Sequence, residues 1–416
     1  MHQTIILPNG ATILCLPIDG VRSAALGFFV GVGSRHEKAA DNGAAHFIEH
    51  MVFKGTGRRS AADLAREMDA IGGQVNAYTT KEHTCFYARC LDKHLDRASD
   101  LLLDMLFSSR FAQEDVETER SVILEEIGMY EDAPEDLVAE RLAAVIYKGS
   151  PLARPILGKQ ATLEAMTGES LAQWQREHYR PGNLVVALAG SFTQAQVDAL
   201  SAQLSQLEPG PAPTTKAAAY HSAITTKRKP IEQNHLLLAF PALTYLDPRR
   251  YEIQLLSSIL GGGCSSRLFQ EVREKRGLCY TVYSYISDHA DTGLMGLYAA
   301  TSREQEQEAL EALLSTAMDL AEHGPTQEEL DRAREQAKAG LLLGLESVQA
   351  RMSQMGASQL LYGRVRSVQE ALDGYDAATR EGLHALAQEI FDLNRASLSA
   401  VGRVARREDY QALLKP

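Results

Sequence analysis

The chain has 416 residues, a length that is comfortable for two domains. Hydrophobic residues make up 45% and charged residues 23%, so the chain can bury full cores and stay in solution. The formal net charge of -12 argues against a nucleic-acid-binding protein, which needs a basic surface. No stretch of sequence is long and apolar enough to cross a bilayer, so no membrane partner is expected.

The N-terminal segment predicts no targeting signal. Residues 5–7 are apolar, but no basic region precedes them and Pro-Asn-Gly follows directly, which is unlike a secretory signal peptide. The five cysteines are odd in number and show no CxxC spacing, so neither a disulfide framework nor a cysteine zinc site is indicated. We therefore expect a cytoplasmic protein.

Strands with alternating or continuous apolar residues are expected at 12–17 and 24–34, and again at 86–91. Between them the segment DNGAAHFIEHMVFKGT, residues 41–56, predicts a helix with Asp41 or Asn42 as its N-cap. Helices and hairpin-connected strands mixed in this way favour an α+β domain, an antiparallel sheet covered by helices on one face.

The predicted helix carries a pattern that suits a metal ion. His46 and His50 are four residues apart, so both imidazoles leave one face of the helix and can bind one tetrahedral ion. Glu49 lies beside them and can reach a coordinated water, from which a carboxylate can take a proton as general base. Two surface histidines are the alternative, but Phe47 and Ile48 make the helix a buried one. The order H-x-x-E-H is the signature of inverzincin peptidases.

The helix expected at residues 114–132 offers a third ligand. A catalytic zinc site has three protein ligands and one position open to water. Glu119 and Glu126 are seven residues apart and lie on one face of this helix. Spacing alone does not choose Glu126 over its neighbour Glu125.

Residues 209–230 are rich in Pro, Ala and Thr and predict a linker. The halves on either side, 1–208 and 231–416, resemble each other, with Gln113-Glu114 aligned to Gln327-Glu328. We interpret this as an internal duplication of one α+β unit, the alternative being a chance match of two helix-and-strand patterns. At this offset Glu119 and Glu126 align with Ala333 and Gly340, so the second domain is expected to bind no metal.

The motifs HFIEHMVFKGT, NAYTTKEHT and ERSVILEEI resemble those of the pitrilysin, insulysin and mitochondrial processing peptidase family of zinc peptidases. The resemblance extends over essentially the whole chain. It implies one Zn²⁺ per chain, held by His46, His50 and Glu126, with Glu49 as the catalytic base. It also implies that Glu119 is a supporting carboxylate that orients a ligand.

The resemblance further implies residues that hold the substrate. The family binds its peptide as an added strand beside the zinc, and the matching stretch gives Asn76 and Ala77. In the second half, the motif R-E-K-x-G-L-x-Y places Arg273 and Tyr280, where the arginine would hold the substrate and the tyrosine would stabilise the oxyanion. From the residues alone these two read as an arginine on a helix surface and a tyrosine in a strand.

The sequence thus predicts two homologous α+β domains that face each other across a cavity, and a zinc-dependent endopeptidase that hydrolyses extended peptides. The family's short members act as dimers, so we expect a homodimer or a heterodimer with an inactive homologue. The competing hypothesis is a non-catalytic subunit of a processing-peptidase-like or respiratory core complex. The intact metal and base residues argue against it.

Overall fold

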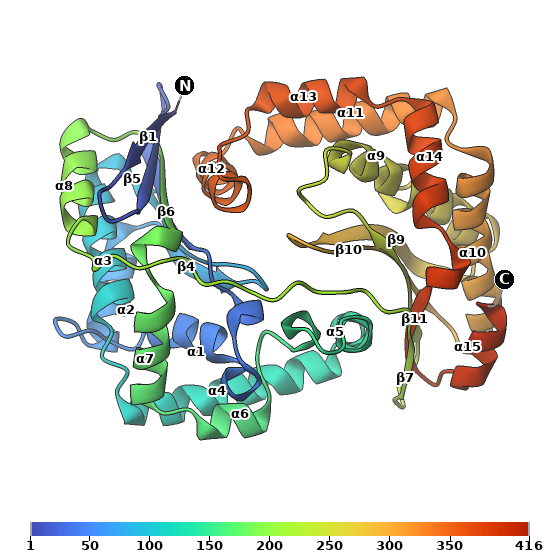
Figure 1. Cartoon of the computed structure of the whole chain (residues 1–416), viewed down its shortest axis with the longest axis horizontal. Coiled ribbons are helices and arrows are strands. Elements are labelled where there is room, and N and C mark those ends of the chain that lie inside the picture. Colours follow the sequence, from blue (N-terminus) through green and yellow to red (C-terminus); the bar gives the residue numbers. More distant parts are fainter. Residues whose placement is uncertain (1, 415–416) are drawn as a thin grey trace. The chain divides into compact units, whose positions relative to one another are not determined.

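The computed structural model describes residues 2–414. These residues form two compact units, each built around one β-sheet (Figure 1). Unit 1 comprises residues 2–127, 154–216 and 343–366, and unit 2 comprises residues 128–153, 217–342 and 367–414. Within the described residues, no helix is both long and apolar enough to span a membrane.

Unit 1 contains a six-stranded sheet in the order β1-β2-β6-β3-β5-β4. The strands are β1 (Gln3–Ile6), β2 (Thr12–Pro17), β3 (Ser23–Val30), β4 (Gln74–Thr79), β5 (Thr84–Leu91) and β6 (Leu184–Gly190). Only β2 and β6 pair in parallel, and all other neighbours are antiparallel. Because β4 lies at the edge, one side of its backbone has no partner strand in this sheet.

The central strand β3 is buried on both faces, which explains its nearly continuous apolar sequence SAALGFFV. Helix α3 packs on one side of the sheet and α12 on the other. The helices of unit 1 are α1 (Ala44–Met51), α2 (Ala61–Ile71), α3 (Leu95–Ser108), α4 (Gln113–Asp132), α6 (Gln160–Ala165), α7 (Gly168–His178), α8 (Gln194–Leu204) and α12 (Val348–Tyr362), of which α4 ends in unit 2.

Unit 2 contains a five-stranded sheet in the order β7-β11-β8-β10-β9. The strands are β7 (Ile224–Arg228), β8 (Asn234–Ala242), β9 (Cys279–Asp288), β10 (Gly293–Thr301) and β11 (Ser397–Gly402). The helices are α5 (Pro134–Ile146), α9 (Arg250–Gly261), α10 (Glu306–His323), α11 (Gln327–Gly344), α13 (Val368–Ala377), α14 (Arg380–Ile390) and α15 (Arg407–Leu413), and a π-helical segment spans Phe269–Lys275. Helix α11 ends in unit 1.

The two sheets confirm the predicted internal duplication. Five strands of unit 1, β2-β6-β3-β5-β4, follow one another in the same order and directions as β7-β11-β8-β10-β9 of unit 2. Each copy contains one parallel pair, which the expectation of a purely antiparallel sheet missed. Parallel pairing joins strands far apart in sequence, so local patterns do not reveal it.

Two segments are exchanged between the sequence halves. Helix α5 occurs in the first half but packs on β11 and β8 of unit 2, with Leu137 and Leu142 in that unit's apolar cluster. Helix α12 occurs in the second half but packs on β3 and β6 of unit 1, through Met352 and Met355. The predicted domain bounds place each helix in the half of the sequence in which it occurs, and they do not anticipate this exchange. The predicted linker at 209–230 also contains β7, because Ile224–Arg228 pairs with a strand near the C-terminus.

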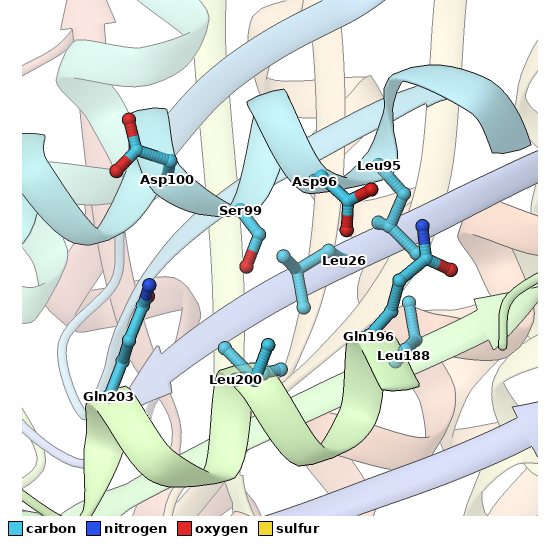
Figure 2. A pocket seen from close by; sticks show the side chains of 10 residues that line it. Leu26, Leu95, Asp96, Ser99, Asp100, Leu188, Gln196, Leu200 and Gln203 are labelled. Carbon is cyan, nitrogen blue, oxygen red and sulfur yellow. The ribbon is translucent and has the colours of Figure 1, made fainter. Parts of the chain in front are cut away.

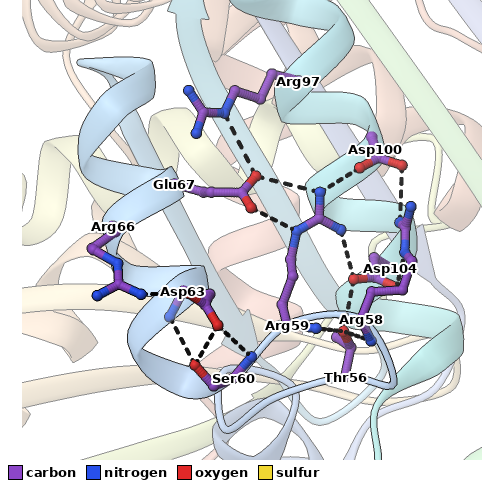
Figure 3. Close-up of polar contacts among 10 residues, drawn as sticks. All are labelled: Thr56, Arg58, Arg59, Ser60, Asp63, Arg66, Glu67, Arg97, Asp100 and Asp104. Carbon is purple, nitrogen blue, oxygen red and sulfur yellow. Dashed lines mark hydrogen bonds and ion pairs between the residues drawn. The ribbon is translucent and has the colours of Figure 1, made fainter.

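A polar network fixes the segment that follows α1 (Figure 3). The Asp104 side chain on α3 is 1% exposed and accepts hydrogen bonds from Thr56, Arg58 and Arg59. Burial alone would raise the pKa of Asp104, but these three donors together lower it. A buried carboxylate with several donors is satisfied, so the loop between α1 and α2 is held firmly against α3.

Candidate metal centre

Helix α1 is anchored at its N-terminus by a side chain from upstream. Glu37 is 3% exposed, and its carboxylate accepts from the backbone N–H groups of Gly43 and Ala45, each at 2.9 Å. These are donors that the first turn of a helix leaves unpaired. Gly43 is the N-cap, with φ of 103°, and a Cβ there would lie 2.9 Å from the Cα of Gly158. The predicted N-cap, Asp41 or Asn42, is therefore wrong: Gly43 is the N-cap, and the Glu37 carboxylate, a few residues upstream, accepts from the N–H groups at the helix start.

The structure brings His46, His50 and Glu126 together. One side-chain ligand atom from each lies within 4.8 Å of the others. Glu126 Oε2 is 3.7 Å from His46 Nε2 and 3.6 Å from His50 Nε2. Ligand atoms about 2.0–2.1 Å from a tetrahedral zinc ion are separated by roughly 3.4 Å, so the three residues fit such an ion after small adjustments. Glu125, the neighbour that spacing left open, is exposed and is not in this cluster.

The two histidines are prepared differently for binding a metal. Burial, with the nearby His50 ring, lowers the pKa of His46 to about 3, so its imidazole is neutral and keeps a lone pair for a ligand bond. His50 places Nδ1 3.0 Å from Glu119 Oε2. A hydrogen bond from Nδ1 to a carboxylate fixes the tautomer and leaves Nε2 as the ligand atom.

Glu119, for which the family resemblance implies a supporting role, has a second partner that sequence reasoning missed. Its side chain is 5% exposed, and its Oε1 lies 2.5 Å from Lys54 Nζ. Lys54, Glu119 and His50 thus form a chain of polar contacts that ends at the cluster. Lys54 stands in the quoted motif HFIEHMVFKGT, but its separation of 65 positions from Glu119 gives no local signal of the contact.

Glu49 stands on α1 directly before His50 and is not one of the three residues of the cluster. Its Oε2 accepts a hydrogen bond of 2.6 Å from Thr79 at the end of β4. Burial raises the pKa of the Glu49 carboxyl, and the Glu126 carboxylate adds to this, while Thr79 and His50 oppose it. A raised pKa brings a carboxylate closer to the strength a general base needs near neutral pH.

The remaining predicted residues lie in two places. Asn76 and Ala77 are on the edge strand β4, where Asn76 is exposed and Ala77 packs partly against the core. Arg273 and Tyr280 belong to unit 2. The Arg273 guanidinium lies 4.7 Å from the centre of the Tyr280 ring, which is 75% exposed, and stacks on Phe269 from the same π-helical segment. Their roles toward a substrate stay predictions.

A separate pocket of about 110 Å³ lies between α3 and α8 of unit 1 (Figure 2). Leucines from β3, β6 and both helices form its floor, and Asp96, Ser99 and Gln203 lie around its rim. Its lining includes neither histidine nor cysteine. It is a small surface recess.

Comparison with protein families finds two matches that follow each other along the chain. Residues 16–160 match the model for insulinase, peptidase family M16. Residues 165–337 match the model for the peptidase M16 inactive domain. The first match contains all the predicted metal residues, and the second contains Arg273 and Tyr280.

Curated relatives carry names that agree with the metal cluster. The uncharacterized zinc protease YmxG of Bacillus subtilis is 40% identical over 92% of this chain and 94% of its own length. An uncharacterized zinc protease of Streptomyces coelicolor is 41% identical over 95% of this chain and 88% of its own.

Solved structures show the same fold. A peptidase M16 inactive domain from Pseudomonas fluorescens superposes with a TM-score of 0.91 at 23% identity, covering 98% of this chain and 99% of that one. A protease from Helicobacter pylori gives a TM-score of 0.87 at 21% identity, covering 97% and 99%.

Proposed function

Because the chain belongs to peptidase family M16, the insulinase family, we propose that it is a zinc-dependent endopeptidase. The observation that carries this proposal is the cluster of His46, His50 and Glu126 with Glu49 beside it. Two imidazoles and a carboxylate are the donor set of many catalytic zinc sites, and three protein ligands leave the fourth position for water. We further propose one ion per chain, since the described residues contain one such cluster.

In this proposal each residue has a separate task. A bound zinc ion would polarise the scissile carbonyl and make a neighbouring water more acidic. Glu49 accepts the proton of that water as it attacks the carbonyl carbon, and then donates it to the departing amine nitrogen. Glu119 holds His50 through Nδ1 and stays outside the ligand set.

The peptide is proposed to lie extended along the edge of β4. The free edge of this strand can pair with one more strand, and Asn76 and Ala77 stand in its middle. Arg273 and Tyr280 of unit 2 are proposed to hold the peptide and to stabilise the oxyanion. We also propose that the chain acts as a homodimer or as a heterodimer with an inactive homologue. Its proposed location is the cytoplasm.

Metal analysis combined with a fluorogenic peptide library tests the function. The purified chain should contain zinc and cleave internal peptide bonds. Excess chelator should abolish cleavage, and added zinc should restore it. A non-catalytic subunit would bind a partner chain but cleave nothing when loaded with zinc. Full activity in a sample shown to be free of metal would refute the zinc mechanism.

A further inference from the structure

The contact between Glu49 and Thr79 joins the metal-site helix to the last residue of β4. Thr79 Oγ1 donates to Glu49 Oε2 at 2.6 Å. Within residues 2–414, the Glu49 carboxylate makes one hydrogen bond, and this is it. Oε2 is thereby tethered to β4, and none of the described residues makes a hydrogen bond to Oε1.

The strand pattern explains why Thr79 faces the helix. Successive side chains of a strand point to opposite faces, and along β4 the partly buried positions are Val75, Ala77 and Thr79. Val75 and Ala77 pack against the apolar core of unit 1, and α1 packs against β4. The hydroxyl of Thr79 therefore enters the side of the sheet on which Glu49 lies, while Asn76 and Tyr78 point the other way.

Thr79 is held in place by its surroundings. It is paired across the hairpin with Thr84, which is fully buried and donates to the carbonyl of Val32 at 2.9 Å. The turn at residues 80–83 is closed by the Thr80 N–H donating to the His83 carbonyl at 2.8 Å.

A neighbouring backbone segment holds the same turn from outside. The N–H groups of Ser34 and Arg35 donate to carbonyls of the turn at 3.2 and 2.8 Å. A Cβ at Gly33 would lie only 2.2 Å from the Thr80 carbonyl oxygen, so the two backbones are in direct contact. The hydroxyl of Thr79 is therefore attached to a rigid part of the unit.

Thr79 also has the right chemistry to hold a carboxylate. A hydroxyl that donates to an ionised carboxylate makes a strong, short hydrogen bond. Its branched Cβ limits rotation about χ1, so the donor direction is defined. Glutamate is flexible, and a base that wanders by about 1 Å from its reacting position can lose a hundredfold in rate.

We propose that Thr79 is a positioning residue for the general base: it holds Glu49 by Oε2, so that Oε1 is directed to the reacting water. The proposal rests on the function proposed above for Glu49. It differs from a purely structural role for Thr79, because valine has nearly the same shape and would preserve the packing while removing the donor.

The test compares Thr79→Val and Thr79→Ser with the parent chain, and uses Thr118→Val as a control. Thr118 is an exposed threonine on α4 that donates to a carbonyl of its own helix. Thr79→Val should lower kcat by about tenfold to a hundredfold with KM and zinc content unchanged. Thr79→Ser keeps the donor and should recover most of the loss. In a Glu49→Gln background, Thr79→Val should cost nothing further.

A crystal structure of the zinc-loaded Thr79→Val chain gives a readout that does not depend on turnover. The Glu49 carboxylate should leave the position it holds in the parent chain, and it should return in Thr79→Ser. An unmoved carboxylate would overturn the proposal, as would a normal kcat in Thr79→Val or an equal loss in Thr79→Ser. If the parent chain cleaves no peptide, the proposed function fails, and the position of Glu49 in the variant structures still decides the role of Thr79.

Discussion

The pairing of Glu119 with His50 gives a quantitative prediction for zinc affinity. The Glu119 side chain is 5% exposed and lies 3.0 Å from His50 Nδ1. Carboxylates in this position contribute about tenfold to a hundredfold in metal affinity, or roughly 1.4–2.7 kcal/mol. Glu119→Gln keeps an acceptor and removes the charge, so we expect a loss near tenfold. Glu119→Leu removes both and also leaves His50 Nδ1 without its partner, so the loss should approach a hundredfold.

Competition with a chromophoric zinc chelator measures this affinity directly. Glu117→Gln is the matched control, since Glu117 is exposed on the same helix two residues earlier. Lys54 is 35% exposed, so water can solvate its charge when Glu119 is replaced, and the fold should persist. A zinc dissociation constant in Glu119→Leu within twofold of the parent value would refute this reasoning.

Three other perturbations have defined outcomes. Tyr280→Phe should lower kcat by about a hundredfold or somewhat more with zinc content intact, if the hydroxyl makes one oxyanion bond; unchanged kinetics would leave Tyr280 as a strand residue. Asp104→Asn should cost about 2–3 kcal/mol in urea unfolding, because it weakens a buried ionic network. Since the pKa of Asp104 is lowered from 3.8 in the folded state, this difference should be complete above that pH and should close as the pH falls below it; a constant difference would contradict the assignment, and Asp69→Asn, at an exposed position of α2, is the control. Gly43→Ala should lower the melting temperature and weaken zinc binding together, because the φ of 103° is strained for alanine and its Cβ would meet Gly158.

The sequence predicted the family, the α+β class and the duplication, because each can be recognised from short motifs and from the local pattern of helices and strands. The spacing of His46 and His50 determines which face of a helix they share, and the structure places both at the cluster. Choosing Glu126 over Glu125 needed the family resemblance, since both are acidic positions on one helix. The structure adds the physical difference: Glu125 is exposed, and Glu126 lies 3.6–3.7 Å from both imidazoles.

Most of the features that were missed depend on contacts between distant parts of the chain. Lys54, the partner of Glu119, stands on a different element from it, far away in the sequence. The exchange of α5 and α12 has the same origin. Each helix carries an apolar face, but the sequence does not say which of two similar sheets will cover it. Glu37 is the exception: it lies close to α1 in the sequence, but it stands outside the N-cap position at which a capping side chain is sought.

Zinc content and peptide hydrolysis, measured together on Glu49→Gln, Glu126→Gln and Glu125→Gln, test the central claim most directly. Glu49→Gln should retain zinc and lose activity by about a hundredfold to ten-thousandfold, the usual contribution of a general base. Glu126→Gln should lose zinc and activity together, and Glu125→Gln should change neither. The account is contradicted if Glu49→Gln loses its zinc, or if Glu125→Gln loses zinc while Glu126→Gln keeps it.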